Sequence, residues 1–287
     1  MNTNVINFLS RIYDRNPISY KYLRECYHAV GGGDKLKKGL KCVAVLLFIP
    51  VYNHKAKKEI EDIRKNDNQY SIRNGKVVFY LPDLDLTNGE FIQNRIFLEQ
   101  NYFEVSHLSQ LRKYVKKNAV ILDIGANLGN HTVFFAKECG AKKIYAFEPT
   151  RETFLILEEN IRINNLDRIV AAMNIALGAK DTKADVIVNA KNAGGNHVEE
   201  NIDGNVIMST LDGLSLSDRI DFVKIDVEGF EFEVLKGAGK TLDRDRPDIF
   251  IEIFDTNYDK VHTLLTQMGY ECKLKMEQDY LYQCKIN

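Results

Sequence analysis

The sequence lacks an excess of charge of either sign. In 287 residues, 39 Lys and Arg side chains stand against 40 Asp and Glu side chains, which leaves a formal net charge of −1. Proteins that bind nucleic acid usually carry a strong basic bias. The composition therefore predicts no nucleic-acid partner, while a hydrophobic content of 45% is enough for a sizeable core.

Cysteine is scarce and scattered. None of the five cysteines lies in a C-x-x-C pair, and their number is odd. This spacing argues against a disulfide framework or a zinc knuckle and favours a reducing, cytoplasmic setting. Cys272 and Cys284 could face each other on a C-terminal hairpin, but buried free thiols are the favoured interpretation.

Long apolar runs are also missing. The most apolar run, 42–51, is too short to span a bilayer, and the first five residues lack the basic-then-apolar layout of a secretory signal. Seven lysines and no acidic residue lie within 35–58. This segment is interpreted as a buried helix with solvated ends, and peripheral contact with an anionic inner membrane surface is the alternative.

The chain changes character twice. Residues 1–68 read as a mainly helical extension, and 69–118 as a lead-in with a β-hairpin around Asn74-Gly75 and helices at 91–99 and 102–116. Residues 119–287 form the third and largest segment. The sequence shows no internal repeat and no low-complexity tract.

Strands and helices alternate regularly after residue 119. The predicted strands are 119–124, 143–147, 169–175, 221–225 and 248–253, with helices at 130–139, 151–164, 229–238 and 257–267. Such alternation is typical of an α/β fold with a mainly parallel sheet. β-prone runs at 184–189 and 205–209 indicate an insertion, and 271–284 predicts a terminal hairpin.

A glycine-spaced turn follows the first of these strands. Residues 123–131 read Asp-Ile-Gly-Ala-Asn-Leu-Gly-Asn-His, and a helical pattern follows. Strand, glycine turn and helix present backbone N–H groups to a nucleotide-like ligand. Asn127 stands where the dinucleotide motif G-x-G-x-x-G requires its second glycine, which argues against a bound pyrophosphate.

Glu148 ends the next predicted strand, 25 positions after Asp123. This offset is close to the ~20 residues that separate a glycine turn from a ribose-binding carboxylate in α/β nucleotide sites. Pro149 stiffens the turn into the following helix. A lone glutamate at a strand end is more often solvated, but the glycine turn favours ribose binding.

Three more carboxylates lie at or near strand ends. Asp226 and Glu228 follow the strand at 221–225, where ligands bind in parallel sheets. Glu252 interrupts an apolar run, and a buried carboxylate there would be costly unless it is paired or at the strand's end. We therefore expect all three to face one cleft.

Together these motifs resemble the FkbM family of S-adenosylmethionine-dependent methyltransferases. The resemblance rests on 123–132, 147–149, Thr210-Leu-Asp212 and 223–231, within roughly residues 80–255. It implies a class I methyltransferase fold: a Rossmann-like, seven-stranded, mostly parallel sheet whose last strand is antiparallel. It also implies methyl transfer to oxygen, commonly a hydroxyl of a sugar or other secondary metabolite.

Carried onto this chain, the resemblance implies which residues bind S-adenosylmethionine. The methionine part would lie against the glycine turn, Glu148 would hold the ribose, and adenine would lie near 174–177. The expected cofactor-binding residues are Asp123, Gly125, Ala126, Asn127, Gly129, Glu148, Pro149 and Asp226.

A hydroxyl is a poor nucleophile at neutral pH, so a nearby base should take its proton. Asp226 is the first candidate, with Glu228 or His131 in reserve, and His131 could equally occupy the first helical turn without a role. Candidate acceptor contacts are Glu252, Asn196 and His197, although a solvated loop is the favoured interpretation for the last two.

The sequence thus predicts a methyltransferase of polysaccharide biosynthesis that acts on a sugar, glycan or glycolipid hydroxyl. The alternatives are a non-catalytic S-adenosylmethionine-binding module and an NAD(P)-dependent oxidoreductase. No clear metal ligand set is present, although Asp226 and Glu228 could hold Mg²⁺ or Ca²⁺. Base methylation of nucleic acid is disfavoured because no Asn-Pro-Pro-Tyr-like motif follows the fourth strand. The sequence predicts no oligomeric state.

Overall fold

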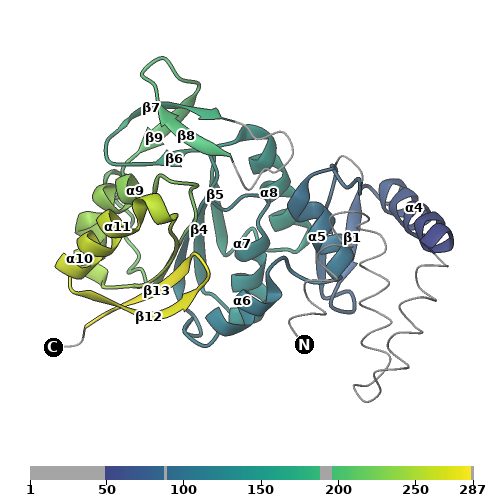
Figure 1. Cartoon of the computed structure of the whole chain (residues 1–287), viewed down its shortest axis with the longest axis horizontal. Coiled ribbons are helices and arrows are strands. Elements are labelled where there is room, and N and C mark those ends of the chain that lie inside the picture. The colour runs from purple at the N-terminus through teal and green to yellow at the C-terminus, as the bar shows by residue number, and fades with distance from the viewer. Residues whose placement is uncertain (1–48, 87–88, 188–195, 286–287) are drawn as a thin grey trace. The chain divides into compact units, whose positions relative to one another are not determined.

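The computed structural model describes residues 49–86, 89–187 and 196–285 (Figure 1). The chain divides into two compact units, Met1–Phe103 and Glu104–Asn287. Helix α6 (Val105–Leu111) belongs to the second unit, to which the ion pairs His107–Asp279 and Arg112–Glu138 connect it. The division into the segments 1–68, 69–118 and 119–287 stays a prediction.

The smaller unit contains the predicted hairpin. Strands β1 (Gln69–Ile72) and β2 (Val77–Tyr80) pair antiparallel, and Asn74 and Gly75 in the turn have φ values of 57° and 80°. Helix α5 (Phe91–Glu99) also confirms its prediction, with the Glu90 carboxylate accepting the backbone N–H of Gln93 at its N-terminus. This side-chain cap explains why the helix begins there.

Helix α4 (Ile49–Lys65) precedes the hairpin and has Pro50 in its first turn, where a missing N–H costs nothing. Most of the lysine-flanked segment 35–58 lies outside the described residues, so its membrane contact stays a prediction. Across the described ranges, no helix combines the length and apolar character that a membrane span requires.

The larger unit is built on one seven-stranded sheet, which confirms the predicted fold class. Its order is β12-β13-β11-β10-β3-β4-β5, and β13 alone runs antiparallel to the other six strands. The strands are β3 (Val120–Ile124), β4 (Lys143–Phe147), β5 (Val170–Met173), β10 (Phe222–Ile225), β11 (Asp248–Glu252), β12 (Tyr270–Met276) and β13 (Asp279–Cys284). The last two form the predicted terminal hairpin.

Helices cover both faces of this sheet (Figure 1). On one side lie α9 (Glu231–Gly237), α10 (Gly239–Asp245) and α11 (Asp255–Gln267). On the other lie α6, α7 (Asn130–Phe134), which continues in a π-helical turn to Cys139, and α8 (Arg151–Ile163). The predicted helix 102–116 is shorter in the structure, and α10 was not predicted.

Alternate residues of the central strands decide what each face buries. Residues such as Leu122, Val223 and Ile251 pack in the core that α9, α10 and α11 complete. On the opposite face, Asp123 and Lys224 are neighbours in the register of β3 and β10 and are only 0% and 2% exposed. Buried charges are costly unless they are paired, so these two side chains must have charged or hydrogen-bonding partners on this face.

The predicted insertion is a separate four-stranded sheet of order β6-β9-β7-β8. Strands β7 (Thr182–Ile187) and β9 (Val206–Ser209) match the two β-prone runs, whereas β6 (Ala176–Leu177) and β8 (His197–Glu200) were not predicted. Ala184 and Met208 form its small buried core.

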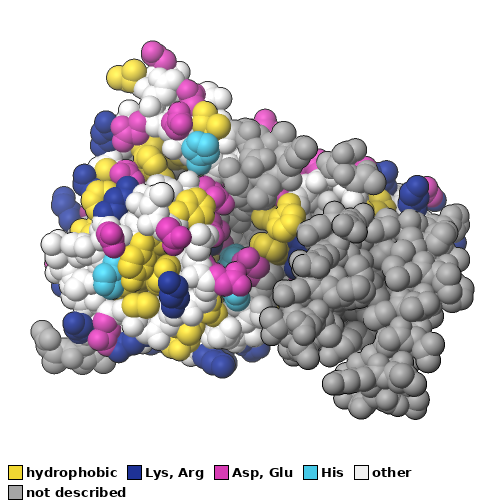
Figure 2. All heavy atoms as spheres, viewed as in Figure 1, with side chains coloured by type: hydrophobic (Ala, Val, Ile, Leu, Met, Phe, Trp, Pro, Cys, Tyr) yellow, Lys and Arg dark blue, Asp and Glu magenta, His cyan; other side chains and the backbone are white. Residues whose placement is uncertain are grey.

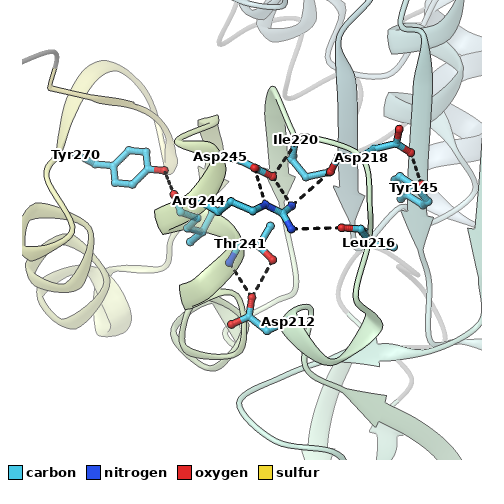
Figure 3. Close-up of polar contacts among 10 residues, drawn as sticks. Tyr145, Asp212, Leu216, Asp218, Ile220, Thr241, Arg244, Asp245 and Tyr270 are labelled. Carbon is cyan, nitrogen blue, oxygen red and sulfur yellow. Dashed lines mark hydrogen bonds and ion pairs between the residues drawn. The ribbon is translucent and has the colours of Figure 1, made fainter.

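A polar network fixes the loop between β9 and β10 (Figure 3). The Arg244 guanidinium pairs with Asp245 at 2.6 Å and donates to the carbonyl of Asp218, whose carboxylate accepts the Tyr145 hydroxyl. Asp212, part of the FkbM-like motif, accepts the backbone N–H groups of Lys240 and Thr241. Asp212 therefore caps α10, which is a structural role.

The described cysteines are free, as expected, but they are not all buried. Cys139 is buried, whereas Cys272 is exposed and Cys284 is partly exposed. Across the terminal hairpin, Cys272 pairs with Tyr282 and Cys284 with Tyr270. The two thiols therefore do not face each other.

Candidate functional site

The glycine turn after β3 lies directly against the backbone after β10. Gly125 has φ 75°, and a Cβ added there would lie 1.8 Å from the carbonyl oxygen of Asp226. Gly129 has φ 94°, and its added Cβ would lie 2.8 Å from a methyl group of Leu157. Both positions require glycine, and Asn127 completes the bend with a φ of 50°.

Asp123 anchors the base of this turn. Its Oδ2 atom accepts a 2.5 Å hydrogen bond from the Thr132 hydroxyl at the start of α7. Its Oδ1 atom lies 3.4 Å from Nζ of Lys224 and has no hydrogen-bond partner among the described residues. A buried acceptor with free capacity beside a glycine turn fits a ligand that brings a donor, such as an amine.

Lys224 is the side chain that connects the two halves of the site. Its Nζ atom donates a 2.6 Å hydrogen bond to the carbonyl oxygen of Gly125 and lies 3.3 Å from the Asp226 carboxylate. Burial lowers the pKa of Lys224, but Asp226 and Asp123 outweigh burial and raise it above its usual value. Lys224 therefore stays charged inside the protein.

Glu148 lies at the end of β4 and is 6% exposed. Its two carboxylate oxygens accept the backbone N–H groups of Asn127 and Thr150, at 2.9 and 2.8 Å. Burial raises the pKa of Glu148, and the two N–H donors oppose that rise. Each oxygen keeps acceptor capacity for a ribose hydroxyl.

The surroundings of Glu148 are fixed by hydrogen bonds. Asn174 donates to the carbonyl oxygens of Glu148 and Pro149, at 2.8 and 2.9 Å, and so holds the turn after β4. Ala126 is buried under the same turn. The expected cofactor-binding residues on β3, β4 and their turns therefore form one connected structure.

Asp226, Glu228 and Glu252 come together at the ends of β10 and β11, with one carboxylate oxygen of each within 4.8 Å of the others. Burial opposes ionisation of Asp226, but Lys224 and a hydrogen bond from Glu252 hold its pKa below the usual value. Burial and the neighbouring Asp226 raise the pKa of Glu252 to about 9. Burial and Asp226 also raise the pKa of Glu228, to about 7.

A second group lies beside the first and was not predicted. It consists of Glu104 before α6, His107 on α6 and Asp279 at the start of β13, where Asp279 pairs with Glu252 in the sheet register. Burial and then Asp279 raise the pKa of Glu104 to about 7, while burial and Asp226 raise that of Asp279 to about 7. No sequence signal joins these residues, because only the fold brings α6 to β13.

Figure 2 shows acidic side chains with histidine gathered near the middle of the visible face. The two groups of carboxylates are compact enough to attract a divalent cation. Because the pKa values of Glu252, Glu228, Glu104 and Asp279 are raised, a cation bound there would displace protons from these carboxyls.

His131 lies in the first turn of α7, with its ring centroid 6.1 Å from that of Phe135. Burial, followed by the charge of Lys224, lowers its pKa to about 4. Asp123 and Asp226 act on its pKa in the opposite direction. It is neutral at physiological pH and a weak base.

Asn196 and His197 lie on the side of the small sheet. The Asn196 amide approaches the Thr150 hydroxyl at 3.5 Å, next to the Glu148 turn. His197 begins β8, with its side chain 42% exposed and 3.7 Å from Glu199. Neither printed partner belongs to the two acidic groups, and the role of both residues as acceptor contacts stays a prediction.

Comparison with known proteins agrees with this geometry. Residues 123–272, more than half of the chain, match the family model described as the methyltransferase FkbM domain. Methyltransferase 1 of Beauveria bassiana is 26% identical over 213 residues, which cover 63% of this chain and 80% of that protein. The hexuronic acid methyltransferase AglP of Haloferax volcanii is 29% identical over 138 residues, covering 46% of this chain and 55% of AglP.

Among solved structures, a methyltransferase FkbM from Methylobacillus flagellatus KT is similar, with a TM-score of 0.45 and 16% identity. The similarity covers 58% of this chain and 43% of that one. The family match rests on the region that contains the glycine turn, Glu148, Lys224 and the carboxylates after β10 and β11. The chain belongs to the FkbM family of methyltransferases.

Proposed function

We propose that this protein transfers a methyl group from S-adenosylmethionine to a hydroxyl of a sugar-containing acceptor, such as a glycan or glycolipid. The observation that carries the proposal is the buried Glu148 carboxylate, which accepts the N–H of Asn127 in the glycine turn. A ribose-binding carboxylate at the end of one strand is thereby fixed to the turn after the neighbouring strand.

S-adenosylmethionine supplies an electrophilic methyl group on a sulfonium. In this proposal, the turn 125–129 receives the methionine part, Asp123 accepts from its amine, and Glu148 binds the ribose hydroxyls. The negative charges of Asp226 and Asp123 suit a cationic sulfonium in a site with little water.

Asp226 lies at the border between the turn and the acidic groups. Lys224 keeps it ionised, so it is suited to accept a hydrogen bond from the acceptor hydroxyl and to align it. The same charge makes Asp226 a weak base, which weakens its assignment as first candidate. Of the three carboxyls there, Glu228 with a pKa of about 7 is best matched to proton transfer at neutral pH.

The sugar acceptor is supported by one relative. AglP, whose name describes a hexuronic acid methyltransferase, is 29% identical over the aligned residues. Several adjacent carboxyl and imidazole groups also suit a polyhydroxylated acceptor, because they both donate and accept hydrogen bonds.

Two measurements test the proposal in sequence. Calorimetry should detect binding of S-adenosylhomocysteine and none of NAD, and the reverse result would establish the oxidoreductase alternative. Glycan and lipid fractions incubated with protein and methyl-labelled S-adenosylmethionine should then take up label at hydroxyl positions. Cofactor binding with neither label transfer nor slow hydrolysis would instead indicate a non-catalytic binding module.

A further inference from the structure

We propose that His107, oriented by Asp279, is the general base that takes the proton of the acceptor hydroxyl. This inference rests on the proposed methyl transfer and adds two residues to it. Both lie outside residues 123–272, the part of the chain that matches the family model. They therefore belong to the sequence that surrounds the shared methyltransferase core.

The position of the pair follows from the sheet. Asp279 begins β13 and pairs with Glu252, the last residue of β11, so its side chain shares a face with the carboxylates after β10 and β11. His107 reaches Asp279 from α6. In open α/β sheets, ligands bind outside the carboxyl ends of the parallel strands, and the pair lies at that edge.

The pair places a carboxylate against one ring nitrogen of the histidine. Nδ1 of His107 lies 3.1 Å from Oδ2 of Asp279, with the two side chains 20% and 16% exposed. An imidazole held through Nδ1 offers Nε2 to a substrate, and the carboxylate stabilises the imidazolium that forms. The contact has the distance of an ion pair without linear hydrogen-bond geometry, and such contacts commonly tighten when substrate binds.

Three other candidate bases in the site are poorly suited to accept a proton at neutral pH. Lys224 holds Asp226 ionised with a lowered pKa, Glu252 keeps its own proton up to a pKa of about 9, and His131 has a pKa of about 4. Glu228 is the remaining competitor, with a pKa of about 7. Among the described residues, however, no ion pair holds its carboxylate, whereas Oδ2 of Asp279 lies 3.1 Å from Nδ1 of His107.

The step balances without another reactant. As the acceptor oxygen forms its bond to the methyl carbon, the carbon–sulfur bond breaks and its electron pair stays on sulfur. The hydroxyl proton passes to Nε2 of His107, so the positive charge lost by the sulfonium appears on the imidazolium. Asp279 then faces that charge at 3.1 Å.

Charged groups on the neighbouring elements lie around this histidine. Glu104 precedes the same helix, Asp279 lies on β13, and Asp226 and Lys224 lie on and after β10. His131 on α7 also interacts with His107.

Single-turnover methyl transfer to the labelled acceptor fraction, measured from about pH 5 to about pH 9, tests the assignment. His107→Gln should lower the rate by roughly 10²- to 10⁴-fold and remove the limb of the pH profile that reports the base, while S-adenosylhomocysteine affinity is kept. Added imidazole should restore part of the rate of His107→Ala. His262→Gln is the matched control and should keep the pH profile, because this histidine lies on α11 and contacts the Tyr282 hydroxyl.

A second measurement does not depend on turnover. NMR should report the tautomer of the His107 ring in the full-length protein, and Asp279→Asn should change it, because the carboxylate that faces Nδ1 is removed. An unchanged ring spectrum would show that Asp279 does not orient this base. A normal rate and pH profile in His107→Gln, with loss of both in Glu228→Gln, would transfer the role to Glu228. Absence of S-adenosylhomocysteine binding by the wild-type protein would reject the proposed function instead.

Discussion

The ammonium group of Lys224 donates a hydrogen bond of 2.6 Å to the carbonyl oxygen of Gly125. One contact thus ties the middle of the sheet to the turn that the proposed cofactor occupies. The same ammonium pairs with Asp123 and Asp226, so two buried carboxylates on adjacent strands depend on one cation. Stability, cofactor binding and acceptor alignment are therefore linked through Lys224.

Replacing Lys224 by methionine should destabilise the protein by about 3–5 kcal/mol, because it leaves buried charges without a partner. It should also raise the His131 pKa from about 4, because Lys224 is one of the groups that lower it. Urea unfolding measures the first effect and NMR titration of His131 the second. Lys273→Met is the control, since this lysine is exposed and should change neither quantity. Lys224→Arg keeps the charge and should therefore leave the His131 pKa low. If the His131 pKa rises in this variant as it does in the methionine variant, the charge of residue 224 is not what lowers it.

Gly125→Ala should abolish S-adenosylhomocysteine binding and cost more than about 2 kcal/mol of stability. The added methyl group would lie 1.8 Å from the backbone oxygen of Asp226, in a residue with φ of 75°. Overpacking alone costs about 1–3 kcal/mol, and the left-handed conformation adds about 1–2 kcal/mol. Gly239→Ala is the matched control, because a Cβ there meets nothing within 4 Å. Calorimetry measures the affinity and urea unfolding the stability of both variants. Equal values for the two variants would contradict the proposed close approach.

The sequence predicted the parallel strands well, since short apolar runs that end in glycine or acidic residues leave few alternatives. It missed α10, because only Ala238 separates this helix from α9 and the predicted helix 229–238 ended there. It missed β6 and β8, whose two and four residues carry too little pattern.

The candidate site was predicted where its residues follow one another along the chain, as in the turn 123–129. Lys224 was missed because a lysine in a strand ordinarily faces solvent, although its two apolar neighbours already marked the strand as buried. His107 and Asp279 are separated by most of the methyltransferase core, and only their packing at the edge of the sheet makes them one group. Long-range pairs of this kind leave no spacing for sequence analysis to detect.

The stability of the protein should fall as the pH rises from about 5 to about 8. The folded-state pKa of Glu252 is raised from 4.5 to about 9 and those of Glu104 and Glu228 to about 7, so the folded protein binds more protons than the unfolded chain in this window. Stability that comes from a raised pKa is complete below the unfolded value and is lost as the pH approaches the folded value.

Glu252→Gln mimics the protonated carboxyl and should flatten this dependence. The free energy of unfolding can change by at most about 1.4 kcal/mol per pH unit for one proton. The substitution should remove less than this slope, because solvent reaches the partly exposed Glu252 carboxyl. Urea unfolding at each pH provides the measurement, with Glu277→Gln, on the turn between β12 and β13, as the control. A stability that increases with pH in the wild-type protein would contradict the raised pKa values.

Glu148→Ala should weaken S-adenosylhomocysteine binding by at least about tenfold, because the ribose loses its carboxylate and hydrogen bonds to a charged group contribute about 1.5–3 kcal/mol. The variant also frees the backbone N–H groups of Asn127 and Thr150, so a loss of stability will accompany the loss of affinity. Glu148→Gln separates the two effects, since its amide oxygen can still accept one N–H while the charge is gone. Calorimetry with adenosine adds a second control: both variants should weaken adenosine as much as S-adenosylhomocysteine, because the two ligands share the ribose. A selective loss of S-adenosylhomocysteine, with adenosine binding unchanged, would place Glu148 against the methionine part of the cofactor.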